Sequence, residues 1–271
     1  MRLWFCTAAC VALMWGAADS TAPNTLTADE KAAGWQLLFD GKTMNGWEDP
    51  RRMSPPGDAW TIEDGCLKAV PHPRIDEDLL SKETFRDFEL QWEWRISPAG
   101  NSGLKYRIQR HGFIPPKPAG AGNENFEASV QRMVTSPMSQ RPNHGQDYVI
   151  GFEYQMIDDT ANGDRLNPKQ TSGALYDMIA PSSHNTLRVG EFNRSRLVVR
   201  GKHVEHWMNG VKVVDSSLDA PEALAGIRGR WGEGTPVFDL LAKQPVKVCP
   251  ISLQNHGDAA WFRSIKVRRL Q

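Results

Sequence analysis

Apolar and polar residues alternate along several short stretches of this chain, the pattern of strands that bury one face. In residues 86–96, RDFELQWEWRI, the alternation places five large apolar side chains on one face: Phe88, Leu90, Trp92, Trp94 and Ile96. Residues 100–108, GNSGLKYRI, and 151–159, GFEYQMIDD, alternate in the same way. We therefore predict three strands here, and their core faces would carry Leu104, Tyr106 and Ile108 in the second and Phe152, Tyr154 and Met156 in the third.

Turn residues separate further apolar runs. Asp64-Gly65 lies between two of them and predicts a hairpin. Residues 195–215, SRLVVRGKHVEHWMNGVKVVD, hold turn signals at 200–202 and 209–210 and predict a three-stranded meander. Residues 248–270, VCPISLQNHGDAAWFRSIKVRRL, predict two final strands on either side of a turn at 255–258.

Helix signals are scarce. Thr27 and Glu30 form a capping box, and Gly34 is a helix stop, so a short helix is expected over 28–33. Residues 219–225 are expected to form one or two helical turns. Many short antiparallel strands with little helix predict an all-β fold, a β-sandwich or jelly roll. Residues 110–147 are rich in Pro, Gly, Asn and Ser and predict a long functional or mobile loop.

The N-terminus, MRLWFCTAACVALMWGAADS, has the pattern of a secretory signal peptide. Arg2 precedes an apolar run that ends near Trp15, and cleavage is expected near Ala18. The run is too short for a transmembrane helix. Cys10 offers a lipoprotein-type alternative. We therefore predict a signal peptide over 1–18 and a single periplasmic or secreted domain over 19–271, with no integral membrane segment once the signal is removed.

Composition narrows the choice of partner. The 271 residues carry a formal net charge of +0 and the sequence pI is about 7.1, which argues against nucleic acid or an anionic membrane as the main partner. Ten tryptophans suit either sugar stacking or a β core, and the core is the default interpretation for most. Signal removal leaves Cys66 and Cys249, which would be either a disulfide or two buried thiols.

Four segments carry polar residues on faces that alternation assigns away from the core: 100–108, 151–159, 171–177 and 252–257. Each segment alone would be a solvated strand face. Together they offer Lys, Arg, Glu, Gln and His, a mixture that suits an array of sugar hydroxyls. These segments therefore predict a carbohydrate site on one sheet.

Two other chemistries fit the sequence less well. Glu153, Gln155 and Asp158 have a spacing similar to the catalytic strand of laminarinase-like glycosidases, but a Gln stands in the middle and an offset of five reverses the face. Residues 158–164, DDTANGD, are similar to the start of a calcium loop, but Lys169 stands where the closing Glu is needed.

Seven segments together resemble the 3-keto-disaccharide hydrolase domain family, and they occur in the family's order over almost the whole mature chain. They read GWQLLFDGKTMNGW, FRDFELQWEWRI, GNSGLKYRI, GFEYQMIDD, TSGALYD, GEFNRSRLVVRGKHVEHWMNGVKVVD and ISLQNHGDAAWFRSIKVRRL. The resemblance implies a concanavalin A-like jelly-roll β-sandwich, here with a short N-terminal helix. It also implies 3-keto-glucoside 1,2-lyase and 3-keto-2-hydroxy-glucal hydratase activity. The sequence departs from the family pattern at Ser264, where Asn is usual, and in the length of 110–147.

The resemblance implies roles for ten residues. The catalytic candidates are Glu153, His256, Lys105 and Arg107, and the substrate-binding candidates are Asn101, Gln155, Asp158, Tyr176, Gln254 and Arg263. A ketone at C3 acidifies the C2–H bond, so elimination at C1 needs a base, an oxyanion stabiliser and a proton donor. Glu153 or His256 would be the base or acid. Lys105 and Arg107, or a divalent metal, would hold the oxyanion; the cofactor stays unknown at this point. The substrate expected is a 3-keto-glycoside.

Two alternatives remain open from the sequence. One is a non-catalytic carbohydrate-binding jelly roll, which would bind sugar without turnover. The other is an ordinary retaining glycosidase, which would cleave an unoxidised glucoside. Glu153 is the strongest single candidate for a catalytic carboxylate, because alternation against Phe152 and Tyr154 would place it on the concave face of the sheet.

Overall fold

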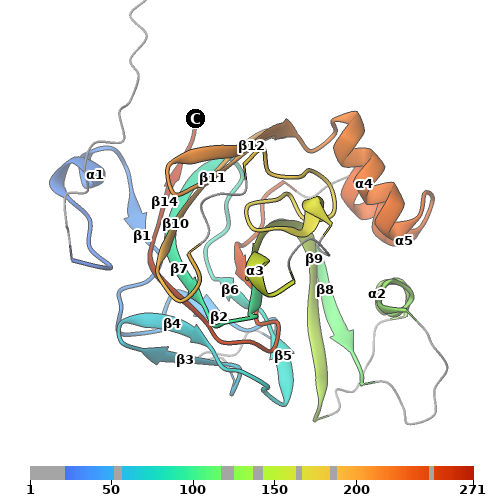
Figure 1. The fold of residues 1–271 in the computed structure, drawn as a ribbon, viewed down its shortest axis with the longest axis horizontal. Coiled ribbons are helices and arrows are strands. Elements are labelled where there is room, and N and C mark those ends of the chain that lie inside the picture. Colours follow the sequence, from blue (N-terminus) through green and yellow to red (C-terminus); the bar gives the residue numbers. More distant parts are fainter. Residues whose placement is uncertain are drawn as a thin grey trace, which may run out of the picture.

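Two β-sheets stack face to face in the computed structural model of the chain (Figure 1). The structure describes residues 22–51, 57–116, 125–136, 143–162, 167–183, 188–243 and 247–271. The predicted signal peptide lies outside these residues. In the described part of the chain, no helix is long and apolar enough to span a membrane. The two sheets confirm the predicted β-sandwich.

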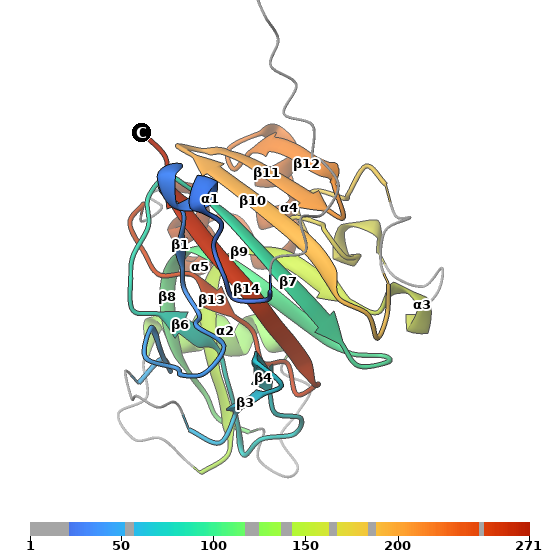
Figure 2. The ribbon, with the colours of Figure 1, turned by 90° about the vertical axis from the view of Figure 1, so that its left-hand side faces the viewer.

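The eight-stranded sheet has the order β12-β11-β10-β7-β14-β4-β3, and β1 also pairs with β14. Its central strands lie in front of the six-stranded sheet in Figure 2. Its strands are β1 (Gln36–Leu37), β3 (Trp60–Glu63), β4 (Cys66–Ala69), β7 (Phe88–Ile96), β10 (Asn193–Arg200), β11 (His203–Met208), β12 (Val211–Ser217) and β14 (Ala260–Arg269).

The six-stranded sheet has the order β2-β6-β13-β8-β9-β5. All its pairs are antiparallel except β5 with β9, which is parallel. Its strands are β2 (Trp47–Glu48), β5 (Ile75–Glu77), β6 (Leu79–Ser81), β8 (Asn101–Ile114), β9 (Gly145–Ile157) and β13 (Ser252–Leu253).

A hydrophobic core lies between the sheets, and it is filled by the apolar side chains at alternate positions of the strands. All five predicted apolar residues of β7 are buried, as are Phe152, Tyr154 and Met156 of β9. Tyr154 packs edge-on against Trp92 of the other sheet, with ring centroids 5.0 Å apart. The buried imidazole of His206 joins the same contact: it pairs with the Tyr106 hydroxyl at 3.0 Å, and burial lowers the pKa of His206 to about 4. The core faces of β7 and β9 were therefore predicted correctly.

Local turn chemistry was also predicted correctly. α1 (Ala28–Ala32) begins at a reciprocal capping box between Thr27 and Glu30. The β3–β4 hairpin turns at Asp64-Gly65, and both residues have positive φ. β10, β11 and β12 form the predicted meander.

Cys66 and Cys249 are both buried free thiols, so the thiol alternative holds and the disulfide does not form.

The two final strands lie on either side of the predicted turn at 255–258, but in different sheets: β13 pairs with β6 and β8, whereas β14 belongs to the eight-stranded sheet. Two expectations about the connections were wrong. Residues 219–225 open a longer helix, α4 (Pro221–Trp231), in which Ala223, Ile227 and Trp231 are buried at helical spacing. Residues 110–147 are not one loop, because β8 runs to Ile114, α2 (Phe126–Thr135) follows, and β9 begins at Gly145.

The helices α2, α4 and α5 (Pro236–Phe238) lie on the side of β8 and β9 that faces away from the eight-stranded sheet, whereas α1 lies beside β1 (Figure 1). Gly112 allows α2 to approach β8 closely, because a Cβ there would lie 2.6 Å from Met133. Gln131 joins α2 to the start of α5, accepting from the Val237 amide at 3.1 Å. The remaining short helices are α3 (Asp159–Asn162), η2 (Pro168–Gln170) and η3 (Asp239–Lys243). α2 and α4 thus form walls above one face of the six-stranded sheet.

Candidate active site

A cavity of about 360 Å³ opens on this face of the six-stranded sheet. Strands β8 and β9 form its floor, α2 and α4 contribute walls, and the loop after β13 closes another side. Six of the ten predicted site residues line it: Asn101, Glu153, Gln155, Tyr176, Gln254 and His256. The other lining residues are Asp76, Phe126, Glu127, Gln146, Tyr148 and Arg230.

Strand register brings the floor residues together. β8 and β9 are antiparallel, with Lys105 opposite Glu153 and Gly103 opposite Gln155. Tyr106 and Tyr154 point into the core. Because side chains alternate along a strand, their neighbours Lys105, Glu153 and Gln155 point the other way. Gly103 leaves the space that the Glu153 side chain occupies, since a Cβ at 103 would lie 2.3 Å from Glu153 Oε1. The floor therefore holds a carboxylate above a small residue.

Gly103→Ala is expected to displace this carboxylate without unfolding the protein. The added Cβ would also lie 2.9 Å from Glu153 Cδ, so the side chain must rotate. A shift of about 1 Å in a catalytic group costs roughly 10²-fold in rate. We expect kcat/KM to fall by about that factor while thermal unfolding changes little, because the end of the Glu153 side chain can move. Near-normal kinetics would show that Glu153 does not need its present position.

Glu153 is half-buried, and burial raises its pKa to about 7, although the cations Lys105 and Arg230 oppose the shift. Its carboxylate accepts no hydrogen bond from the residues that the structure describes. A second, very small cavity of about 10 Å³ is lined by Glu153 together with Lys105, Tyr148, Tyr176 and Arg230. Glu153 therefore changes its protonation near neutral pH, between two cations.

Lys105 is fully buried, and its ammonium is held by a second buried carboxylate. Lys105 Nζ lies 3.0 Å from Asp78 Oδ2, and the Ser252 hydroxyl donates to the same oxygen at 3.0 Å. Nζ also lies 4.8 Å from the centre of the Tyr148 ring. Burial disfavours the ammonium, but Asp78 and Glu153 keep the pKa of Lys105 above its usual value. Lys105 is thus a fixed positive charge beneath the cavity.

Arg230 is the second cation, and α4 supplies it. Its guanidinium stacks over the rings of Tyr176 and Trp231, with its central carbon 4.8 Å and 4.7 Å from their centres. Asp177 holds Nη1 at 3.3 Å. Nε is buried and has no hydrogen-bond partner in the described part of the protein. Stacking and the Asp177 ion pair thus hold the Arg230 guanidinium, and this residue brings a positive charge to the cavity wall.

The loop after β13 brings in Gln254 and His256. The Gln254 amide donates to Gly103 O at 2.8 Å, and the Ser102 hydroxyl donates to Gln254 O at 2.8 Å. Gln254 is 5 % exposed, and its Oε1 has no partner among the described residues. His256 is exposed at the rim, with Asp76 nearby. Burial raises the pKa of Asp76, and the proximity of His256 opposes this.

The structure does not bring Arg107 into the cavity, although it was expected beside Lys105. The β8–β9 register shifts between Tyr106 and Arg110, and Arg107 itself has φ +50°. This bulge turns Arg107 away, and its guanidinium donates to Gly201 O at 2.7 Å and contacts Asp87 at 3.2 Å. Ile108 is displaced as well and packs in a separate cluster with Leu80, Val149 and Cys249. The expected alternation therefore ends at Tyr106.

Asp158 also lies outside the cavity lining. Its carboxylate accepts from the amides of Ala99 at 2.8 Å and Thr160 at 2.9 Å, and so ties the end of β9 to the turn before β8. Burial opposes the shift, but hydrogen bonds from Thr160 and Ala99 lower the pKa of Asp158. Its role in this structure is to anchor a loop.

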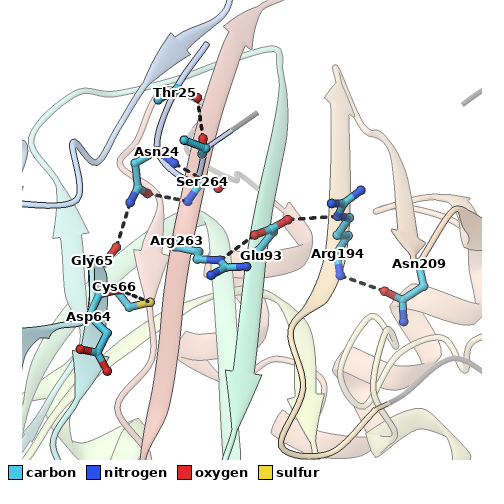
Figure 3. Close-up of polar contacts among 11 residues, drawn as sticks. Asn24, Thr25, Asp64, Gly65, Cys66, Glu93, Arg194, Asn209, Arg263 and Ser264 are labelled. Carbon is cyan, nitrogen blue, oxygen red and sulfur yellow. Dashed lines mark hydrogen bonds and ion pairs between the residues drawn. The ribbon is translucent and has the colours of Figure 1, made fainter. Parts of the chain in front are cut away.

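Arg263 lies on the eight-stranded sheet, away from the cavity. Figure 3 shows it beside Glu93 on the neighbouring strand, with Arg194 on the other side of the same carboxylate. Arg263 Nε donates to Glu93 at 2.7 Å, and its guanidinium lies 3.7 Å from the centre of the Phe192 ring. Ser264 next to it has φ +51° and accepts and donates hydrogen bonds with Asn24. This motif joins β14 to its surroundings and forms no part of the cavity.

The residues that could hold a metal ion were compared over the described part of the chain. Among the described residues, the grouping of three His, Cys, Asp or Glu whose ligand atoms lie within 4.8 Å of one another is His203, Glu205 and Asp215 on β11 and β12. There the Lys212 ammonium already pairs with Asp215 and lies 3.4 Å from Glu205. In the cavity, Glu153, Asp76 and His256 offer ligand atoms that do not converge in this way.

Several residues of the site were not predicted from the sequence, chiefly Asp76, Asp78, Phe126, Tyr148 and Arg230. Asp76 and Asp78 stand at alternate positions of IDEDLL, a pattern that places both on one face of a strand. Phe126 packs edge-on against Tyr148, with centroids 5.0 Å apart, but it lies in a segment that was expected to be loop. Arg230 lies on a helix whose length was underestimated.

The arrangement suits proton transfer beside a developing negative charge. A carboxylate with a pKa of about 7 can accept a proton at neutral pH. Two neighbouring cations can stabilise an oxyanion in a water-poor environment. Amide groups of Asn101, Gln155 and Gln254 line the same cavity and can bind hydroxyl groups.

Comparison with known proteins gives three findings. The family described as the 3-keto-alpha-glucoside-1,2-lyase-like domain matches residues 34–268. A Bacteroides thetaiotaomicron protein named 3-keto-disaccharide hydrolase is 30% identical over 254 residues, which cover 88% of this chain and 79% of that protein. A crystal structure from Parabacteroides distasonis, of a protein named as a candidate glycosyl hydrolase, has a TM-score of 0.66 and 25% identity. The match covers 92% of this chain and 100% of that one.

Proposed function

This chain belongs to the 3-keto-alpha-glucoside-1,2-lyase-like family, and we propose that it cleaves 3-keto-glycosides by eliminating the C1 substituent. The observation that carries the proposal is Glu153, a half-buried carboxylate with a pKa of about 7 between the cations Lys105 and Arg230. A base of this pKa beside two cations can remove a proton from the carbon next to a ketone. The name of the Bacteroides relative supports the same substrate class.

The proposed reaction has two steps, an elimination and an addition of water. Glu153 accepts the proton from C2. The C2–H electron pair forms a C2–C3 double bond, and the carbonyl π pair moves onto the C3 oxygen, where Arg230 and Lys105 stabilise the negative charge. The oxygen pair then re-forms the C3 carbonyl, the C2–C3 π pair forms a C1–C2 double bond, and the C1–O bond breaks with its electron pair on the departing oxygen. His256 donates a proton to the departing oxygen. Addition of water across C1 and C2 then yields the free 3-keto sugar, so the net change is hydrolysis.

The pH dependence follows from the protonation of Glu153. The base form is required, and burial places its pKa at about 7, so kcat/KM is expected to rise with pH and reach half its maximum near pH 7. To identify the group that gives this limb, the profile is repeated with His256→Asn, using the residual activity. A limb that persists near pH 7 in this variant belongs to Glu153. A limb that vanishes belongs to His256 and contradicts the assignment.

One assay tests the proposed function against its alternatives. The protein is incubated with a 3-keto-glucoside and with the matching unoxidised glucoside, with Glu153→Gln as the control. Cleavage of the keto sugar alone is expected. Cleavage of the plain glucoside would instead support a retaining glycosidase, and binding without turnover would support a non-catalytic binding module. Repeating the assay with a chelator tests whether a divalent metal takes part.

We further propose that the protein acts in the periplasm or outside the cell. The support is the signal-peptide pattern of residues 1–18, which lie outside the described part of the structure. Protein recovered from its native host should begin near Asp19. An intact Met1 would contradict export by this route.

A further inference from the structure

A second, more open cleft of about 670 Å³ adjoins the catalytic cavity, and we propose that it binds the leaving sugar of a disaccharide substrate. This rests on the proposed function and assigns a place to each sugar unit: the keto unit lies in the inner cavity and the leaving sugar lies in the outer cleft, beside α4. Both volumes lie in the range of small-molecule sites, about 300–1,000 Å³.

The two spaces are continuous through shared residues. Glu127 of α2 and Arg230 of α4 line both. Arg230 stacks over Tyr176, which lines the inner cavity, and pairs with Asp177, which lines the outer cleft. Arg230 therefore lies where the two spaces meet, beside the path that a bound disaccharide must follow.

The outer cleft exists because α4 carries small residues on the face that borders it. Ala225, Gly226 and Gly229 lie at i, i+1 and i+4, on the same face as Arg230. The two glycines differ. A Cβ at Gly226 would lie 2.6 Å from Asp177 O and Met178 Cα, so that glycine serves close packing. A Cβ at Gly229 would meet nothing within 4 Å, so that position opens into the cleft.

The chemistry of the cleft suits hydroxyl groups and not an apolar aglycone. Asn125 and Asn167 use their side-chain oxygens to cap α2 and η2, at 2.9 Å from Ala128 N and 3.0 Å from Lys169 N, which leaves their amide nitrogens as donors. Glu127 adds an acceptor and Lys169 a cation, 3.6 Å from Glu222. Such a mixture of donors and acceptors without large apolar side chains matches a sugar.

The test fills the outer cleft and compares two keto substrates of the same anomeric configuration. One is a 3-keto-disaccharide and the other a methyl 3-keto-glucoside, which lacks the second ring. In Gly229→Trp, the ratio of kcat/KM for the disaccharide to kcat/KM for the methyl glycoside is expected to fall at least tenfold. Arg228→Trp is the matched control, because it places the same ring on the same helix at a residue that lines neither space, and its ratio should stay within twofold of wild type.

Other outcomes overturn the inference. An unchanged ratio in Gly229→Trp, or an equal loss on both substrates, would show that the outer cleft does not hold the leaving sugar. Binding of the plain disaccharide and of methyl glucoside, followed by NMR titration, separates this from the chemistry. If wild type cleaves neither keto sugar but binds the disaccharide, and Gly229→Trp loses that preference, the cleft assignment stands and the proposed reaction fails. Equal wild-type affinity for both ligands would refute the cleft assignment directly.

Discussion

Glu153→Gln is expected to lower turnover of a 3-keto-glucoside by about 10²–10⁴-fold while the protein stays folded. Glutamine keeps the shape of the side chain and removes its basicity. The fold should be unaffected because the carboxylate makes no hydrogen bond to the described residues, and its backbone carbonyl, which accepts from Tyr176 N at 3.0 Å, is unchanged.

Stability separates this catalytic role from a structural one. The pKa of Glu153 is raised to about 7 in the folded protein, above its usual value of 4.5, so the folded state binds the extra proton between these values. Stability contributed by this group is therefore lost as pH rises through that window. At pH 8 the neutral Gln variant should unfold at the wild-type temperature or above it. A lower melting temperature together with lost activity would indicate that Glu153 anchors the structure.

A matched substitution controls for the loss of a carboxylate. Glu48 lies on β2 of the same sheet, is half-buried, and does not line the cavity. Glu48→Gln should leave turnover within twofold of wild type. If Glu153→Gln also keeps near-normal turnover, the assignment of the base is wrong, and His256 becomes the leading candidate.

Lys105→Met is expected to destabilise the protein by about 3–5 kcal/mol, because it leaves the buried Asp78 carboxylate without its cation. Lys105 and Asp78 are each about 98 % buried as side chains, and their atoms lie 3.0 Å apart. Such a loss is a large part of the 5–15 kcal/mol that typically stabilises a domain. Urea unfolding at pH 7, followed by tryptophan fluorescence, measures it.

The double variant Lys105→Met with Asp78→Leu distinguishes the pair from its parts. Removing both charges should restore much of the stability that Lys105→Met loses, because no buried charge is then uncompensated. Activity should not return with the fold, since the fixed positive charge beneath Glu153 is gone. Additive losses in the double variant would mean that the two groups are not coupled. Recovered activity would mean that Lys105 is only structural.

The sequence alone determined the local structure of this protein. Alternation placed Phe152 and Tyr154 in the core and Glu153 on the opposite face, because a strand has a two-residue period wherever it stays regular. The α1 capping box and the Asp64-Gly65 turn depend on neighbouring residues only, and both were predicted correctly. The resemblance to a family implied ten site residues from separate segments of the chain, and six of them line one cavity.

Tertiary structure decided everything that depends on pairing between distant segments. The segment GNSGLKYRI does not predict the bulge at Arg107, because the pairing of β8 with β9 sets the register, and the alternation within β8 does not. Arg263 lies on the eight-stranded sheet because β14 pairs with β4 and β7, which are distant from it in the sequence. Arg230 reached the cavity only because α4 packs its buried face against the core and turns the other toward Tyr176. Local patterns state which face a residue occupies, but contacts between remote segments decide what that face meets.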